Sequence, residues 1–370
     1  MAQAWASSPA EPNEPSEWRA EVGTLTLFRL KADNLFVQYR RFDYPPSRCF
    51  DYGVKATVLG AIFLLLSIGT EALDFNSTHN SAKGGDACSQ FNLGLIYFQG
   101  MGVAKDDKLA FEWYEKAAKQ GHANAQNNLA DMYSKGEGVA ENHKLAVEWY
   151  LKAAQQGVAV AQANLGMMYS KGEGVAMDKK IAFEWYKKAA KQGYAEAQFN
   201  LGIIFQNGEI VTQNYKTAFQ WFIKAAKQGH SKAQNNIGDM YDNGRGVVED
   251  DKLAVEWLSK AAQKGLSHAQ ANLGNMYYKG EGVTQSDSLA LELYEKAAKQ
   301  GHGPAQYNIG VFYITGREVN QSVLTAYAWF TNAKANGFEK AQEAVQILEA
   351  EMTEDQITAG QKLAKKLIKN

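Results

Sequence analysis

The sequence is poor in the features that mark disulfide-rich, nucleic-acid-binding and membrane-spanning proteins. Its 370 residues include two cysteines, Cys49 and Cys88, which cannot form a framework of repeated disulfides. Lys plus Arg (39) and Asp plus Glu (40) almost cancel. We therefore expect no broad basic surface that neutralises phosphates, and no nucleic-acid partner. The apolar stretch from Val58 to Gly69 has only 12 residues, whereas a membrane-spanning helix needs about 20.

This apolar stretch resembles the central part of an export signal. Lys55 precedes it and the small residue Ala72 follows it, which is the order of regions in a secretory signal peptide. We interpret residues 54–72 as a signal peptide cleaved near Ala72, which predicts a periplasmic or secreted protein. Two alternatives stay open: an uncleaved anchor in the inner membrane, which would be the only membrane contact, and an apolar helix buried in a domain. Residues 1–53 are irregular, and translation starting at Val54 would place the leader at the N-terminus.

The sequence shows no pattern typical of a catalytic, metal or cofactor site. Cys88 has no histidine nearby in sequence, and no serine has a lysine or histidine partner that can be recognised. His122, His230 and His302 share one repeat position and lie at least 72 residues apart, unlike the closely spaced ligands of a helical metal site. We expect them to lie at helix starts. We therefore predict that the protein is not an enzyme and binds no cofactor or metal.

A repeat of 36 residues dominates the chain. Similar text recurs in seven consecutive copies between Gln90 and Val319, and a fixed period of this length indicates a solenoid of stacked units. In each copy a first helix is expected between two glycines, since glycine readily ends a helix. In the second copy Leu129, Met132 and Tyr133 share one helical face. The sequence predicts an all-α fold, an α-solenoid of seven helix-turn-helix repeats over residues 85–337, with residues 73–84 as a linker.

The second helix of each copy begins after a residue that can cap a helix N-terminus. These residues are Asp106, Asn142, Asp178, Asn214, Asp250, Ser286 and Ser322. Tryptophan follows at one position in six copies, and Leu293 replaces it in the other: Trp113, Trp149, Trp185, Trp221, Trp257 and Trp329. We expect each tryptophan to fill the gap opposite small alanines within its hairpin.

These residues resemble the Sel1-like repeat, a relative of the tetratricopeptide repeat. The resemblance lies in Ala-x-Ala-Gln-x-Asn-Leu-Gly-x-Met-Tyr-x-x-Gly-x-Gly-Val, followed by Ala-x-x-Trp-Tyr-x-Lys-Ala-Ala-x-x-Gly. It implies a right-handed α-solenoid that serves as a protein adaptor, in bacteria often exported and tied to signalling, envelope function or host interaction. Some cysteine-rich relatives carry a β-lactamase label, but this chain lacks their paired cysteines. Two copies, at Ile210 and Glu318, lack the second loop glycine, which predicts a different loop shape there.

The segment after the repeats is predicted to cover the end of the array. Residues 338–370 continue helically, and Thr353 followed by Gln356 is typical of a capping box that starts a final helix. This lysine-rich helix can place Leu363 and Leu367 on the last repeat. We therefore interpret residues 338–370 as C-terminal capping helices.

Two sets of positions in the first helices are candidates for binding. Gln90, Asn92 and their equivalents recur in every copy; they could contact a bound peptide, but their constancy favours hydrogen bonds between neighbouring repeats. A second stripe, at i, i+3, i+7 and i+10, varies between copies, and in tetratricopeptide-like packing it lines the concave groove. Its candidate partner-binding residues are Phe91, Leu95, Phe98, Asn127, Asp131, Met167, Phe199, Ile203, Asn235, Asp239, Asn275, Tyr278 and Tyr307.

An exposed apolar patch framed by charge is typical of a protein-binding groove. The alternative for Phe91 and Phe98 is that residues 73–82 cover them. The sequence thus predicts a monomeric, non-enzymatic scaffold that binds protein partners through its concave face, in the cell envelope. A β-lactamase-like hydrolase and a purely structural envelope protein are the alternatives.

Overall fold

The computed structural model describes residues 75–368, and this part of the chain is built from the helices α3 to α19 without a strand. Residues 1–53 and the predicted signal peptide at 54–72 lie outside the described residues. Between residues 75 and 368, no helix combines the length and apolar character that crossing a bilayer requires. The all-α prediction is confirmed.

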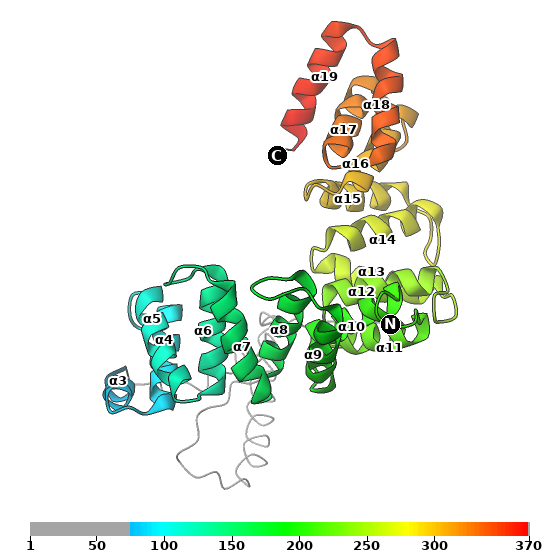
Figure 1. The fold of residues 1–370 in the computed structure, drawn as a ribbon. Coiled ribbons are helices and arrows are strands. Elements are labelled where there is room, and N and C mark those ends of the chain that lie inside the picture. The colour runs from blue at the N-terminus through cyan, green and yellow to red at the C-terminus, as the bar shows by residue number, and fades with distance from the viewer. Residues whose placement is uncertain (1–74, 369–370) are drawn as a thin grey trace, which may run out of the picture. The chain divides into compact units, whose positions relative to one another are not determined.

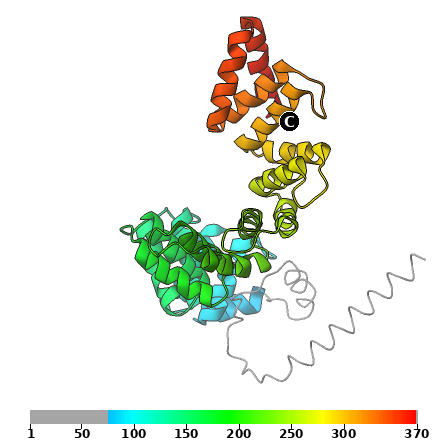
Figure 2. The same cartoon turned by 90° about the vertical axis from the view of Figure 1, so that its right-hand side faces the viewer.

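Seven helical hairpins follow one another in chain order (Figures 1 and 2), and each of their helices packs mainly on its neighbours in sequence. The first and second helices of the hairpins are α4 (Ala87–Gln99) and α5 (Asp107–Lys119), α6 (Ala123–Lys135) and α7 (His143–Gln155), α8 (Ala159–Lys171) and α9 (Lys179–Lys191), α10 (Ala195–Asn207) and α11 (Tyr215–Lys227), α12 (Ser231–Asp242) and α13 (Asp251–Gln263), α14 (Ser267–Lys279) and α15 (Asp287–Ala298), and α16 (Gly303–Thr315) and α17 (Val323–Ala335). α3 (Phe75–Lys83) precedes them, and α18 (Glu339–Glu351) and α19 (Glu354–Leu367) follow.

The predicted helix caps are confirmed. All seven predicted residues cap their second helices, and each side chain accepts a hydrogen bond from a backbone amide of the first turn. The histidines also cap helices: Nδ1 of His122, His230 and His302 accepts from the backbone amide three residues later, at 3.1, 3.1 and 3.2 Å. A ring nitrogen that accepts this bond must be unprotonated. These histidines therefore stabilise helix starts in the neutral form.

The gap inside each hairpin is filled by the residue that follows the tryptophan position. These residues are Tyr114, Tyr150, Tyr186, Phe222, Leu258, Tyr294 and Phe330, and all are at most 5% exposed. They pack so closely on the first helix that a Cβ added at Gly202 would lie 2.4 Å from the Phe222 ring. This contact explains the glycine of the Leu-Gly pair in the repeat.

Four of the six tryptophans occupy a different place from the one expected, whereas Trp113 and Trp329 are buried. Trp149, Trp185, Trp221 and Trp257 are half-buried and pack against the edges of the clusters between repeats. A lysine three residues later covers each ring, with Nζ 3.8 to 4.3 Å from the ring centroid. The prediction placed the wrong one of two adjacent aromatic residues in the gap, because neighbouring side chains on a helix point about 100° apart.

The recurring glutamines join one repeat to the next, as their constancy indicated. Gln90 Nε2 donates to Ala82 O, in the preceding helix, at 3.1 Å. Gln90 Oε1 accepts from Nε2 of Gln120, which ends the second helix of the same copy, at 2.7 Å. The equivalent glutamines of all other copies except the fifth make the same two bonds: Gln126, Gln162, Gln198, Gln270 and Gln306. In the last copy the donor to the glutamine Oε1 is Asn336. The fifth copy differs, because Lys264 stands where the others have an amide.

The two loops without a second glycine behave differently from each other. In the copies with glycine after the first, the loop lies on the preceding hairpin, and a Cβ added at Gly138 would be 2.1 Å from Asp107 O. Glu318 keeps the left-handed backbone, with φ at 59°, whereas Ile210 does not adopt it. Each of these loops is tied to the preceding repeat by an ion pair, Lys179 with Glu209 and Arg317 with Asp287. The predicted change of loop backbone therefore occurs in the fourth copy and not in the seventh.

Helices cover both ends of the repeat array. Within the expected linker at 73–84, α3 forms a helix whose Ala82 packs with Leu93 and Ile96 of α4. Phe91 and Phe98 belong to another cluster, so α3 does not cover them as the alternative had proposed. At the other end, the capping box of Thr353 and Gln356 is present.

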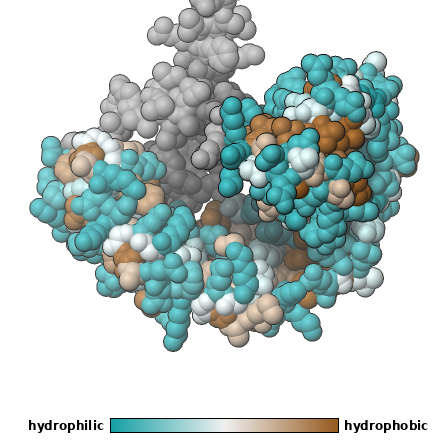
Figure 3. Space-filling model, turned by 90° about the horizontal axis from the view of Figure 1, so that it is seen from above, coloured by the Kyte–Doolittle hydropathy of each residue, from teal (hydrophilic) through white to brown (hydrophobic). Residues whose placement is uncertain are grey.

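The last helix packs on α17. Its Gly360 and Ala364 are buried, and Asn332 Nδ2 of α17 donates to Ala364 O at 3.0 Å. Leu367 packs against the cluster of the last hairpins as predicted, and Leu363 is half-buried. Apolar side chains remain partly exposed on these terminal helices, with Ile347 at 56%, and Figure 3 shows an apolar patch on this end amid a mainly hydrophilic surface.

Candidate functional site

The candidate site is the outward surface of α4, α6, α8, α10, α12, α14 and α16, which we name the first-helix face. Each of these helices buries its remaining sides against the second helices before and after it. The stripe predicted from the sequence lies on this surface, but two of its residues are covered. Phe91 is only 5% exposed and stacks on His122 with 4.6 Å between ring centroids. Asn127 is only 8% exposed.

The other predicted residues of the stripe keep part of their surface exposed: Leu95, Phe98, Asp131, Met167, Phe199, Ile203, Asn235, Asp239, Asn275, Tyr278 and Tyr307. Several of them also take part in the packing of the array. Phe199 stacks on His230 at 4.6 Å between centroids, and Ile203 packs on the cluster around Phe222. Met167, at 36% exposed, is the most open of the large apolar residues in the stripe.

A hydrogen-bond network joins neighbouring first helices at the centre of this face. Asp131 accepts from Tyr150 Oη, from Asn164 Nδ2 at 3.3 Å, and from Asn127 Nδ2 at 3.2 Å. Burial raises the pKa of the Asp131 carboxyl, and the bond from Tyr150 opposes this rise. All three donors are neutral groups.

The same arrangement recurs four repeats later with an amide in place of the carboxylate. Asn275 Oδ1 accepts from Tyr294 Oη at 2.7 Å and from Asn308 Nδ2 at 3.3 Å. Sequence reasoning chose Asp131 and Asn275 and expected the equivalents of Asn92, which include Asn164 and Asn308, to bond between repeats, but it missed the donors Tyr150 and Tyr294. The available signal was their constant spacing of 19 residues from the acceptor in both copies.

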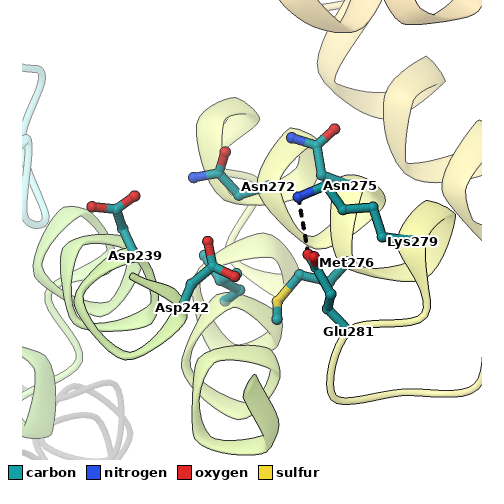
Figure 4. Close-up of a pocket in the computed structure, with 8 residues that line it drawn as sticks. Asp239, Asp242, Asn272, Asn275, Met276, Lys279 and Glu281 are labelled. Atoms are coloured by element: carbon teal, nitrogen blue, oxygen red, sulfur yellow. Dashed lines mark hydrogen bonds and ion pairs between the residues drawn. The ribbon is translucent and has the colours of Figure 1, made fainter. Parts of the chain in front are cut away.

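A small polar pocket lies on the first-helix face between α12 and α14 (Figure 4). Its volume is about 70 Å³, and its lining is Asp239, Asp242, Leu258, Asn272, Asn275, Met276, Lys279 and Glu281. Lys279 Nζ lies 3.0 Å from Glu281 Oε2, and Arg245 Nη1 lies 3.4 Å from Asp239 Oδ2. Burial, together with the negative charge of Glu281, raises the pKa of Asp242. Three carboxyl groups line this pocket beside one ammonium group and the Arg245 guanidinium, so acidic groups outnumber basic ones by one and the pocket suits a positively charged side chain.

The sequence predicted no metal site. Among the residues that the structure describes, no group of three or more histidine, cysteine or acidic side chains is arranged to hold a metal ion.

Stacked hairpins joined by constant polar side chains, with one variable face, define a repeat protein of the α-solenoid class. The family model described as the Sel1 repeat matches seven consecutive segments of the chain: residues 89–122, 123–158, 159–194, 195–230, 231–266, 267–302 and 303–338. The chain belongs to the Sel1 repeat family. This confirms the resemblance derived from the sequence.

Two solved structures illustrate the relationship. A Sel1 repeat protein from Oxalobacter formigenes is 34% identical, with a TM-score of 0.61; the match covers 66% of this chain and 96% of that chain. A protective antigen of uropathogenic Escherichia coli strains is 32% identical, with a TM-score of 0.56; the match covers 80% of this chain and 71% of that chain. No curated protein matched.

Proposed function

We propose that this protein is a non-enzymatic scaffold that binds a segment of a partner protein across its first-helix face. Sel1 repeats generally mediate protein–protein interaction. The observation that carries the proposal is the contrast between constant and variable positions. The side chains of the constant glutamines are occupied by hydrogen bonds within the array. In the variable stripe, Met167, Tyr278 and the residues of the acidic pocket keep part of their surface exposed.

The chemistry of the pocket suggests what the partner segment contains. Asp239 and Asp242 project from α12, and Asn272 and Asn275 supply amide groups from α14. A lysine or arginine of the partner can enter this pocket and form charge-assisted hydrogen bonds. Tyr278 lies one helical turn from Asn275 and is half-buried. Cζ of Arg317 covers its ring at 4.6 Å from the centroid, so Tyr278 marks this surface but does not serve as a stacking platform.

Site-specific photocrosslinking tests the location of the binding surface. A photoreactive amino acid at Tyr278 should capture a discrete protein from the native cell envelope, whereas the same group at the exposed Glu148 of α7 should not. Equal capture of that protein from Glu148 would contradict binding through the first-helix face.

The pocket is tested with the partner that this crosslink identifies. The D239N/D242N variant should lose affinity by about tenfold or more, because each bond to a charged group contributes roughly 1.5–3 kcal/mol. The matched variant E249Q/E256Q removes two carboxylates from the same repeat outside the pocket and should bind like the wild type. If both variants lose affinity equally, the effect is one of net charge and the pocket is not the contact.

We further propose that the protein is exported and that residues 54–72 are its signal. The uncharged run from Val58 to Gly69 supports this proposal, as does the similarity to a protein described as a protective antigen. Intact-mass measurement on cell fractions should find a periplasmic or secreted species that begins shortly after Ala72. A cytoplasmic species that retains residues 54–72 would contradict export with cleavage.

A further inference from the structure

The near-zero net charge of the chain conceals an uneven distribution over the second helices. α9 carries five lysines and one glutamate, a net charge of +4, and α11 carries three lysines and no acidic residue, a net charge of +3. By comparison, α5 carries three lysines and three acidic residues, and α13 carries two of each, so both helices have a net charge of zero. The excess positive charge is therefore concentrated on two successive repeats.

The structure brings these two helices together at their C-terminal ends. Gln228, the C-cap of α11, donates from Nε2 to Gly193 O, just after α9, at 2.8 Å. The last turns of both helices thus lie next to each other, and each contains two lysines. We name as the lysine patch the exposed lysines of the two helices other than Lys179, which is paired with Glu209: Lys180, Lys188, Lys191, Lys216, Lys224 and Lys227.

Two apolar side chains are exposed beside the lysine patch. Met177 is 63% exposed and Ile181 is 39% exposed. Met177 lies in the loop just before the N-cap of α9, and Ile181 lies in the first turn of this helix. From Ile181 an outward line along α9 continues with Glu184, Lys188 and Lys191, at helical spacings of i, i+3, i+7 and i+10. This surface of α9 therefore presents one apolar side chain near its start, one carboxylate, and two ammonium groups in its last turn.

We propose that the lysine patch docks on an anionic membrane surface, with Met177 and Ile181 entering the headgroup region. Basic clusters are attracted to anionic lipids, and exposed apolar side chains on the same surface add affinity by leaving water. The patch lies on the second helices, so membrane docking leaves the first-helix face free and does not depend on the proposed function.

Two features favour a membrane over a nucleic acid as the occupant. The tryptophan rings within the patch are covered by the protein's own lysines: Lys188 Nζ lies 3.9 Å from the centroid of Trp185, and Lys224 Nζ lies 4.3 Å from that of Trp221. These rings cannot stack on bases, which is how proteins hold single strands. The exposed Met177 and Ile181 would gain nothing from a phosphate backbone, whereas a lipid headgroup layer can bury them.

Vesicle co-sedimentation tests the charge requirement. The wild type should bind vesicles of equal parts phosphatidylcholine and phosphatidylglycerol, and should not bind pure phosphatidylcholine. The K180Q/K216Q variant should lose binding by at least tenfold, because each lysine near an anionic surface contributes roughly a fivefold factor in partitioning. The matched variant K108Q/K144Q removes lysines from the same repeat positions of α5 and α7, outside the patch, and should bind like the wild type. Equal losses in the two variants would overturn the proposal, as would equal binding to both kinds of vesicle.

A second variant tests the apolar contribution and separates a membrane from other polyanions. M177S/I181S should bind the anionic vesicles several-fold more weakly, while its retention on immobilised heparin should match that of the wild type. Circular dichroism should show unchanged helix content, since both side chains are exposed. Binding to a single-stranded oligonucleotide or to heparin with no binding to anionic vesicles would overturn the membrane proposal.

Discussion

Lys264 interrupts the glutamine ladder of the array, and restoring the amide should stabilise the protein. In the fifth copy Lys264 Nζ donates to Gly229 O. Gln234 is 5% exposed, and its Oε1 is left without a hydrogen-bond partner among the described residues. In the second copy one glutamine does both tasks: Gln156 Nε2 donates to Gly121 O at 3.0 Å and to Gln126 Oε1 at 2.7 Å. Lys264→Gln should therefore keep the bond to Gly229 and add the missing one.

The expected gain is about 1 kcal/mol. A neutral hydrogen bond contributes roughly 0.5–1.5 kcal/mol net, and an unsatisfied buried acceptor costs roughly 1–3 kcal/mol, part of which is relieved here. Denaturant unfolding followed by circular dichroism measures the free energy, and amide hydrogen exchange should show slower opening at α12 and α13, since repeat arrays respond locally.

The reciprocal change is the control for this prediction. Gln228→Lys recreates the arrangement of the fifth copy in the fourth, where Gln228 Nε2 now bonds both Gln198 Oε1 and Gly193 O at 2.8 Å. It should destabilise the array by about the amount that Lys264→Gln gains. If Lys264→Gln leaves the unfolding midpoint unchanged or lowers it while Gln228→Lys is neutral, the ladder does not contribute to stability and the reasoning is refuted.

Three further predictions concern a cap, a tight contact and the binding face. Burial and the nearby His268 lower the pKa of His302 to about 4. Folding therefore favours the neutral ring, which accepts from Ala305. The stability present above pH 6.5 should fall by roughly 1–2 kcal/mol as the pH drops towards 4. This loss should be absent from His302→Asn in denaturation across that pH range, and an unchanged pH profile would contradict it. Gly202→Ala should lower the free energy of unfolding by roughly 1–3 kcal/mol, because the added methyl group overpacks on Phe222. Ala130→Gly, at the equivalent position, should relieve no clash. Equal thermal midpoints for Gly202→Ala and wild type would count against the contact. Phe199→Ser with Ile203→Ser should weaken partner binding by more than tenfold. Because both side chains also pack on the cluster around Phe222, this variant should lower the thermal midpoint, and wild-type partner affinity in the folded variant would exclude them from the binding surface.

The repeat array, its period and the helix boundaries within it could be predicted without the structure, whereas α3 lies in the segment predicted as a linker. Glycine ends helices and Asp, Asn or Ser begins them through bonds within a few residues, so these signals can be read locally, and the capping box at Thr353 and Gln356 was found for the same reason. The constancy of Gln126 and its equivalents between copies also indicated correctly that they join repeats.

Only the tertiary structure decided which side chains are left for binding. Phe91 is covered because His122 comes from the next repeat, and the partners of Asp131 lie 19 and 33 residues away on other helices. Trp185 and Tyr186 are adjacent in sequence and therefore point in directions about 100° apart around the helix. The spacing of apolar residues alone does not show which of the two enters the gap inside the hairpin. The lysines of α9 and α11 form one patch because Gln228 joins the helix ends, although the charges of the whole chain nearly cancel. Local bonds set the helices, and contacts between repeats set the surface.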